Sequence, residues 1–373
     1  MFSTKIKDKK AKQPSKIAEI LNLNRIPTPA RIGVDIGSSA VKMVELKQNG
    51  KHIQLMGFAS VPFPHNCIDA QGVHDVEAVA GTIRQCWEKM STSTKNAVIS
   101  IPPSNIVTKI FKMPGGLNPT QQMNEAEKEA EKQLPFPVAD AVWDWVPLET
   151  PGVEPFGALL VAAMKDKLNE RVGVVEAAGL TTSVVDIENL STRELLMTAG
   201  AEVSPVQDQA FALIDVGHSV INFCVFKNNR PIFRRELNVS RVEMERDWQA
   251  AMRLDDTEFR MARKSKLPEW EESGLPLIKI LAEDIARGLS GYHALSKDDE
   301  VMSIYLMGGG SALPNLVECV QEQTLKKVEK WDPFANIQVP PKWIDTINQD
   351  GALFAVAAGL ALRKFDKSAT VGE

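Results

Sequence analysis

Short apolar runs and amphipathic stretches succeed one another along the chain, and their spacing predicts an order of strands and helices. The apolar run that begins at Ile32 opens a β-rich segment that reaches about Val61, and a helix is expected near residues 76–90. The stretch "NAVISIPPSNIVTKIFKMP" predicts a strand, a Pro-Pro turn and a second strand. Asn118 and Pro119 then begin a predicted helix with a capping box. "FGALLVAAMKDKLNERVGVVEAAGL" predicts a strand followed by a helix.

Part of the β-rich start is repeated later in the chain. "IGVDIGSSAVKMVEL", residues 32–46, aligns with "ALIDVGHSVINFCVF", residues 212–226. In this alignment three positions coincide: Asp35 with Asp215, Gly37 with Gly217, and Ser39 with Ser219. One such turn alone fits an ordinary structural hairpin, because Asp, Gly and Ser are the residues that turns favour. Two copies, each between two apolar strands, favour a duplicated functional hairpin.

The repeated turns have the chemistry of a phosphate site. Glycine lets the backbone approach a ligand closely, and successive turn amides form a concavity that binds anions. The carboxylates of Asp35 and Asp215 would repel phosphate unless a cation lay between them, and Mg²⁺ is often held through carboxylates and water beside phosphate. We therefore predict Mg²⁺ oriented through water by these two aspartates. The groups expected around the phosphates are Gly37, Ser38, Ser39, Lys42, Gly217 and Ser219.

A third motif is rich in glycine. "VMSIYLMGGGSALPNL", residues 301–316, reads as a strand, a triple glycine and a helix start, with Ser311 expected to cap that helix and Pro314 in its first turn. The glycines would let a flat ring approach the backbone, although their spacing is not the dinucleotide fingerprint G-x-G-x-x-G. Taken alone, the stretch also fits a tight connection between a strand and a helix.

Composition and charge limit the classes of function. The 373 residues suffice for two or more domains, and the net charge of −5 disfavours a nucleic-acid binder. The four cysteines are far apart and without zinc-type spacing, which suits a reducing cytoplasm. Apolar runs fall short of the ~20 residues of a transmembrane helix, and the basic N-terminus lacks the apolar segment of a signal peptide. We expect a cytoplasmic protein that meets membrane peripherally or through a partner.

The first residues form a lysine-rich arm. Ile17, Ile20 and Leu21 follow it at helical spacing, and a basic amphipathic segment of this kind can contact anionic lipid. The alternative is a disordered tail that aids solubility.

In order along the chain, these motifs resemble those of the actin-like ATPase superfamily, which includes actin, MreB, FtsA, sugar kinases and 70-kilodalton heat-shock chaperones. "DIGSS" with Lys42 resembles the first phosphate motif and "DVGHS" the second. "VVDIENLS" resembles the first connecting helix, with Glu188 at its acidic position, and "GALFAVAAGLAL" resembles the second. The resemblance implies ATP or ADP with Mg²⁺ as the ligand. It also implies an adenosine motif at Gly308, Gly309, Gly310 and Ser311.

Three further stretches are similar to PilM-type type IV pilus assembly proteins: "EKQLPFPVADAVWDWVPLE", "AAGLTTSVVDIENLS" and "GLALRKFD". This resemblance covers about residues 30–366. It implies an α/β protein of the actin-like ATPase fold, with two lobes, duplicated mixed sheets and an FtsA-like inserted 1C subdomain. It implies a cytoplasmic ATP-binding platform at the inner membrane, which holds the N-terminal cytoplasmic tail of PilN in a groove between subdomains 1A and 1C. It leaves open further contacts with the pilus assembly motor or platform protein and self-association.

The expected subdomains follow that family's order. They are a basic N-terminal arm at 1–29, subdomain 1A at 30–100, the 1C insertion at 101–180, 1A again at 181–206, 2A at 207–242, 2B at 243–299, 2A again at 300–340, a return to 1A at 341–366, and a tail at 367–373.

The chain departs from the family pattern near the second phosphate motif. Ile221 stands where relatives tend to carry threonine, and Val239 and Ser240 stand about where they tend to carry two glycines. We therefore expect slow ATP hydrolysis or none, with Glu188 as the residue that would position a water.

Two alternatives stay open at this stage. A small-molecule kinase of the same fold needs an aspartate base that we do not find in a convincing context, and an FtsA-like filament protein needs a C-terminal membrane helix, which "RKFDKSATVGE" does not resemble.

Overall fold

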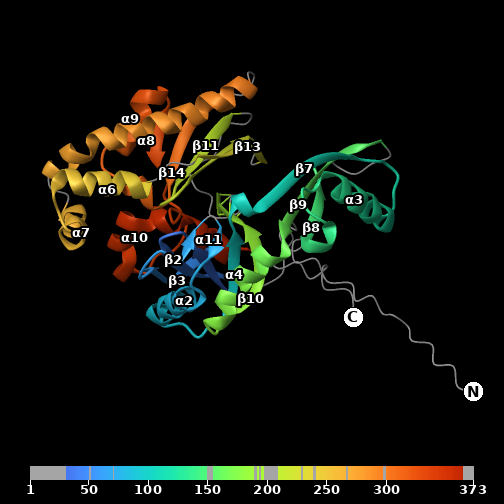
Figure 1. Cartoon of the computed structure of the whole chain (residues 1–373), viewed down its shortest axis with the longest axis horizontal. Coiled ribbons are helices and arrows are strands. Elements are labelled where there is room, and N and C mark those ends of the chain that lie inside the picture. Colours follow the sequence, from blue (N-terminus) through green and yellow to red (C-terminus); the bar gives the residue numbers. More distant parts are fainter. Residues whose placement is uncertain are drawn as a thin grey trace, which may run out of the picture. The chain divides into compact units, whose positions relative to one another are not determined.

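The computed structural model describes residues 31–49, 52–69, 71–148, 154–188, 191–192, 195–196, 209–227, 230–237, 241–265, 268–296 and 300–363. Two compact units divide these residues (Figure 1). One is Asn105–Asn169, called the inserted unit below, and the other is formed by the described parts of Ala30–Ser104 and Glu170–Arg363, called the main unit. The predicted arm at 1–29 and the tail at 367–373 lie outside the described residues.

The first sheet of the main unit has the strand order β10-β6-β1-β2-β3. Its strands are β1 (Arg31–Ile36), β2 (Ala40–Asn49), β3 (His52–Pro62), β6 (Asn96–Ile101) and β10 (Thr181–Ile187). β1, β2 and β3 pair antiparallel, whereas β6 is parallel to both β1 and β10. A short hairpin of β4 (Ile68–Asp69) and β5 (Gly72–Val73) precedes helix α2 (Val76–Met90), where the hydrophobic pattern predicted a helix.

The second sheet repeats the plan of the first. Its order is β13-β12-β11-β14-β15, with the first three strands antiparallel and the last two parallel. The strands are β11 (Ala210–Val216), β12 (Ile221–Lys227), β13 (Arg230–Leu237), β14 (Val301–Met307) and β15 (Lys327–Lys330). The repeated sequence motif thus corresponds to a duplicated mixed sheet. The predicted α/β fold with two lobes of duplicated sheets is confirmed.

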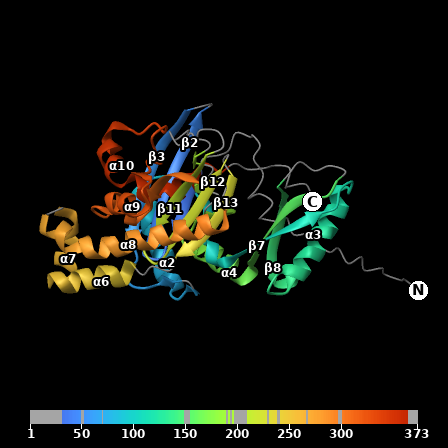
Figure 2. The ribbon, with the colours of Figure 1, turned by 90° about the horizontal axis from the view of Figure 1, so that it is seen from above.

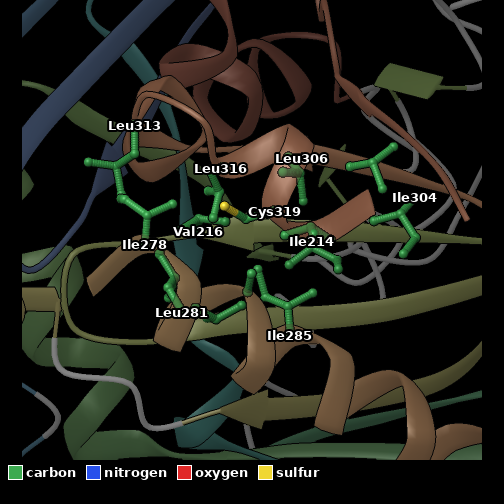
Figure 3. Close-up of a cluster of buried hydrophobic side chains, with 14 of the residues drawn as sticks. Ile214, Val216, Ile278, Leu281, Ile285, Ile304, Leu306, Leu313, Leu316 and Cys319 are labelled. Carbon is green, nitrogen blue, oxygen red and sulfur yellow. The ribbon is translucent and has the colours of Figure 1, made fainter. Parts of the chain in front are cut away.

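Helices pack on the second sheet and form its core. They are α6 (Arg241–Met252), α7 (Asp256–Ser265), α8 (Pro268–Leu295) and α9 (Leu316–Thr324). Figure 3 shows Ile278, Leu281 and Ile285 of α8 against Ile214 and Leu306 of the sheet, and all five side chains are buried. The predicted 2B stretch at 243–299 therefore contributes to one hydrophobic cluster with the sheet.

The last helix returns the chain to the first sheet. A 3₁₀ segment, η5 (Gly351–Phe354), follows α10 (Ile344–Asp350) and leads into α11 (Ala355–Ala361), which packs on β1. The approach is close, because a Cβ on Gly33 would lie 1.9 Å from the carbonyl oxygen of Ala357. Only glycine fits at that position of β1 without displacing the helix.

The inserted unit is a three-stranded antiparallel sheet with a helix on one face (Figure 2). Its strands β7 (Ile106–Met113), β8 (Ala141–Pro147) and β9 (Phe156–Met164) take the order β7-β9-β8. Helix α3 (Pro119–Gln133) begins with the predicted capping box, in which the side chains of Asn118 and Gln121 each accept from the other residue's backbone N–H. Of the expected 1C stretch at 101–180, which stays a prediction, Asn105–Asn169 belong to this unit, and helix α4 (Lys165–Ala177) continues from it into the main unit.

One stretch that was expected to be a helix is divided between a strand and a helix. The stretch "VVDIENLS" was expected to be helical, but residues 184–187 form the end of β10 and the helix begins at Glu188, because β-branched residues there pair with β6 in the sheet. None of the helices in the described part of the chain combines the length and hydrophobicity that spanning a membrane requires.

Candidate functional site

The two repeated motifs form hairpin turns of the same geometry. The β1–β2 and β11–β12 hairpins each have a four-residue turn, in which the amide of Gly37 donates to Ala40 and the amide of Gly217 donates to Val220, both at 3.1 Å. The turns face each other, since the hydroxyl of Ser219 donates to that of Ser38 at 2.9 Å. The structure therefore brings together turns that are 180 residues apart in the sequence.

A cavity of about 1100 Å³ lies where the turns meet. Residues of both lobes line it, and they include most of the predicted site residues: Asp35, Gly37, Ser38, Ser39, Lys42, Glu188, Asp215, Gly217, Ser219, Gly308, Gly309 and Ser311. Gly310 is not part of the lining. It is buried against Val216, whose Cγ1 atom a Cβ on Gly310 would approach to 2.2 Å. Gly310 therefore packs behind the residues that line the cavity, and its predicted contact with adenosine stays a prediction.

Lys42 is held by an aspartate of its own hairpin. Its ammonium nitrogen lies 2.8 Å from Oδ2 of Asp35, and these two residues are cross-strand partners in the β1–β2 register. Burial disfavours the ammonium, but the charges of Asp35, Asp215 and Glu188 outweigh that penalty and raise the pKa of Lys42. The corresponding partner of Asp215 in the second hairpin is the neutral Asn222. The duplicated turns thus differ in charge, and the lysine belongs to the first alone.

Glu188 is the carboxyl group most affected by its surroundings. It begins the helical turn after β10 and lines the cavity. Burial, followed by the charges of Asp35 and Asp215, raises the pKa of Glu188 to about 8, although Arg171 and Lys42 oppose the shift. Three carboxyl groups in one electrostatic environment favour either a retained proton or a bound cation.

The glycine-rich turn after β14 is shaped around Asp215. Gly308 has φ +79°, and a Cβ there would lie 2.0 Å from Oδ1 of Asp215, so glycine is required on both counts. The prediction that Ser311 caps the next helix is wrong. The hydroxyl of Ser311 donates to the carbonyl of Gly308 at 2.7 Å, and Asn315 is the N-cap residue of α9. A 3₁₀ segment, η3 (Gly309–Ala312), intervenes and uses the serine to close its own turn.

The charges around the cavity bear on the choice of ligand. Among the residues that the structure describes, seven carboxylic acids and three lysine or arginine side chains line it. An anionic ligand would be repelled by this balance unless it brought a cation, so the lining suits a Mg²⁺-bound polyphosphate better than a free one. No cluster of three or more His, Cys, Asp or Glu in the described ranges is placed to hold a metal directly.

Motif reasoning missed several residues that line the cavity. They are Arg171, His218, Asn222, Glu236, Trp270 and Glu271. Asn222 could have been found, since it occupies the position in the second hairpin that Lys42 occupies in the first. Trp270 and Glu271 come from the start of α8, for which no motif in the sequence gave a signal.

Comparison with known proteins agrees with this geometry. The family model described as type IV pilus assembly protein PilM matches residues 33–365. Among solved structures, one described as the PilM-PilN type IV pilus biogenesis complex has 24% sequence identity and a TM-score of 0.76, and the match covers 91% of this chain and 99% of that one. The ethanolamine utilization protein EutJ from Carboxydothermus hydrogenoformans has 15% identity and a TM-score of 0.54, with 91% and 92% covered. The two solved structures match the duplicated, two-lobed fold, and the family model matches nearly the whole chain. This chain therefore belongs to the PilM family of type IV pilus assembly proteins and has the actin-like ATPase fold.

Proposed function

We propose that this protein is an ATP-binding assembly platform of the type IV pilus inner-membrane complex, and that it binds the cytoplasmic tail of a PilN-type membrane protein. The observation that carries the nucleotide part is the pair of matching glycine turns, which meet at a serine–serine hydrogen bond of 2.9 Å beside a cavity of about 1100 Å³. That volume slightly exceeds the ordinary range of small-molecule sites, about 300–1,000 Å³. It suits a nucleotide with its cation and water.

In this proposal the nucleotide lies across both lobes. The amides and hydroxyls of the two turns donate to the phosphates, with Lys42 as the charged donor. Asp35 and Asp215 orient Mg²⁺ through water, and the Gly308 turn takes the adenosine. When bound, Mg²⁺ supplies the positive charge that the acidic lining requires.

The substitution Asp215→Ala tests this assignment. It should weaken binding of Mg-ATP more than binding of Mg-free ADP, because the aspartate acts on the cation. Asp69→Ala is a matched control, since Asp69 also lines the cavity but pairs with His74 at 2.7 Å. Calorimetry measures both ligands, and equal binding by the wild type and the Asp215 variant would refute the assignment.

The partner part of the proposal concerns the inserted unit. A related structure at 24% identity is described as a complex of PilM with PilN, which motivates a PilN-type tail as the partner here. On the sheet face opposite α3, Ile110, Leu159 and Val146 form one cross-strand row, and Ile110 is 70% exposed. Such a row offers apolar contacts to an extended peptide, whose backbone could add to an edge strand. The location of the tail in a groove between subdomains 1A and 1C stays a prediction.

We expect micromolar affinity for the free tail peptide, because ordering a flexible segment offsets much of the contact energy. The substitution Ile110→Asp should weaken binding of the peptide, and deletion of the insertion should abolish both binding and envelope localisation.

Deletion of residues 1–29 should leave both peptide binding and envelope localisation intact, because recruitment comes from the partner. If loss of the arm alone released the protein into the cytosol, the basic arm would be the membrane anchor and the recruitment model would be wrong. Contacts with the pilus motor or platform protein and self-association are proposed as secondary, and nucleic acid is not a proposed partner.

A further inference from the structure

The cavity contains a cation that motif comparison does not identify. Arg171 lies in helix α4, and its Nη1 atom donates to the carbonyl oxygen of Ile36 at 3.1 Å. Ile36 is the last residue of β1 and directly precedes Gly37, the glycine of the first turn. The arginine side chain also lines the cavity. One guanidinium thus fixes the entry to the first turn and faces the space that the turn encloses.

The residue before Arg171 holds a second part of the cavity wall. Oε1 of Glu170 accepts a hydrogen bond from the amide of Val73 at 2.5 Å. Val73 belongs to the β4–β5 hairpin, in which Ile68 and Asp69 line the cavity. Two consecutive residues in the middle of α4 therefore fix two walls of the same cavity, which favours a role for this part of the helix in the site over one in general packing.

The three cations that line the cavity differ in their partners. Lys42 is bonded to Asp35 at 2.8 Å, and Lys330 donates to the carbonyl oxygen of Gln349 at 2.8 Å from an exposed position. Arg171 is more buried than Lys330, and its bond goes to a neutral carbonyl group. A guanidinium carries five N–H donors in a fixed fork, so it can hold Ile36 and donate to an anionic oxygen at the same time.

We infer that Arg171 is a phosphate-binding and turn-positioning residue of the nucleotide site, supplied by helix α4. This inference rests on the proposed binding of nucleotide. It assigns the residue to the polyphosphate, because the turn that it holds belongs to the first phosphate motif, away from the Gly308 turn proposed for adenosine. Its effect on affinity should therefore depend on the number of phosphates in the ligand.

The test compares Arg171→Met and Arg171→Lys with the control Arg84→Met. Arg84 lies in helix α2 and also donates to a backbone carbonyl, since its Nη2 atom bonds the carbonyl oxygen of Ala177 in α4 at 3.0 Å, but it is exposed and does not line the cavity. Calorimetric titrations with Mg-ATP, Mg-ADP and adenosine give three dissociation constants for each protein. Loss of a hydrogen bond to a charged group should weaken Mg-ATP binding roughly 10- to 100-fold for Arg171→Met. Mg-ADP should weaken less and adenosine within about twofold, while Arg171→Lys keeps the charge and recovers part of the loss.

Several results would overturn the inference. One is binding of Mg-ATP by Arg171→Met that matches the wild type or the Arg84 control. Another is an equal loss for adenosine and Mg-ATP, which would indicate a structural role in the lobe. If the methionine variant fails to fold, the lysine variant decides, since unchanged Mg-ATP binding would exclude a role for the guanidinium fork. A wild-type protein that binds none of the three ligands would instead overturn the proposed function, and this inference with it.

Discussion

Replacing Gly308 by alanine should damage the nucleotide site more than it damages the fold. The new Cβ atom would lie 2.0 Å from Oδ1 of Asp215 and 3.0 Å from the carbonyl oxygen of Val216. An ordinary contact begins near 3.4 Å, so the Asp215 carboxylate would have to move by about 1.4 Å. Asp215 is only 9% exposed and stands at the end of β11, which leaves the carboxylate little room to move without turning away from the cavity.

The substitution has two costs, one in the stability of the fold and one in the affinity for the ligand. Gly308 has φ +79° and ψ 176°, a region that essentially only glycine populates, and a residue with a Cβ there costs roughly 1–3 kcal/mol of stability. The displacement of Asp215 adds an effect on the ligand. If that carboxylate orients Mg²⁺ through water, its displacement should weaken Mg-ATP binding by about 10-fold or more, which corresponds to about 1.4 kcal/mol.

Gly179→Ala is the matched control. Gly179 has φ +87°, close to the value at Gly308, but a Cβ there would meet nothing within 4 Å. Both variants should lose stability in thermal unfolding, Gly308→Ala the more because its Cβ also meets Asp215 and Val216, and only Gly308→Ala should lose Mg-ATP affinity in calorimetry. Equal affinity for Mg-ATP in the two variants would refute the argument that glycine at position 308 leaves room for the Asp215 carboxylate. A Gly308 variant as stable as the wild type would refute the estimate of backbone strain.

Three other predictions concern stability and turnover. Gly33→Ala should cost about 1–3 kcal/mol or more and shift the unfolding midpoint down, because its Cβ would lie 1.9 Å from the backbone of α11, whereas Gly81→Ala in α2 meets nothing and should stabilise by roughly 0.5–1 kcal/mol. The pKa of Glu188 is raised to about 8, so the folded state keeps a proton that the unfolded state loses near pH ~4.3. The free energy of unfolding of the ligand-free protein should therefore fall as the pH rises from about 5 to 8. Glu188→Gln should flatten that slope in unfolding experiments. ATP hydrolysis should be slow or absent, and Glu188→Ala should abolish whatever phosphate release a sensitive assay detects; robust turnover that survives this substitution would contradict both statements.

Sequence reasoning succeeded where the determinants are local. The two D-x-G-x-S turns, the capping box at Asn118 and the helix at Val76–Met90 depend on residues within a few positions of one another. Their geometry therefore follows from turn and cap chemistry, and a duplicated motif was enough to indicate a duplicated sheet. The bond between Lys42 and Asp35 also follows from the hairpin register, although Lys42 was considered only as a phosphate ligand.

Other features depend on contacts that the sequence does not display. The bond from Arg171 to Ile36 joins residues 135 apart, and an arginine in a helix is expected at the surface until the fold is known. The "VVDI" stretch could be strand or helix by periodicity, and pairing with β6 decides for the strand. Ser311 has the composition of a cap, but a 3₁₀ turn lies between it and α9. In each case tertiary contacts, or the geometry of one turn, outweigh the local pattern.

The hydrogen bond between Ser38 and Ser219 makes it possible to lock the cleft chemically. Its two hydroxyl oxygens are 2.9 Å apart and come from different lobes, so cysteines at both positions would place their sulfur atoms near the ~2.05 Å bond length of a disulfide. The four native cysteines are buried, which leaves an introduced pair as the accessible thiols for a mild oxidant. Oxidation would then tie the lobes together and reduction would release them. A pilus assembled with the locked protein would reveal whether its assembly requires the lobes to separate at all.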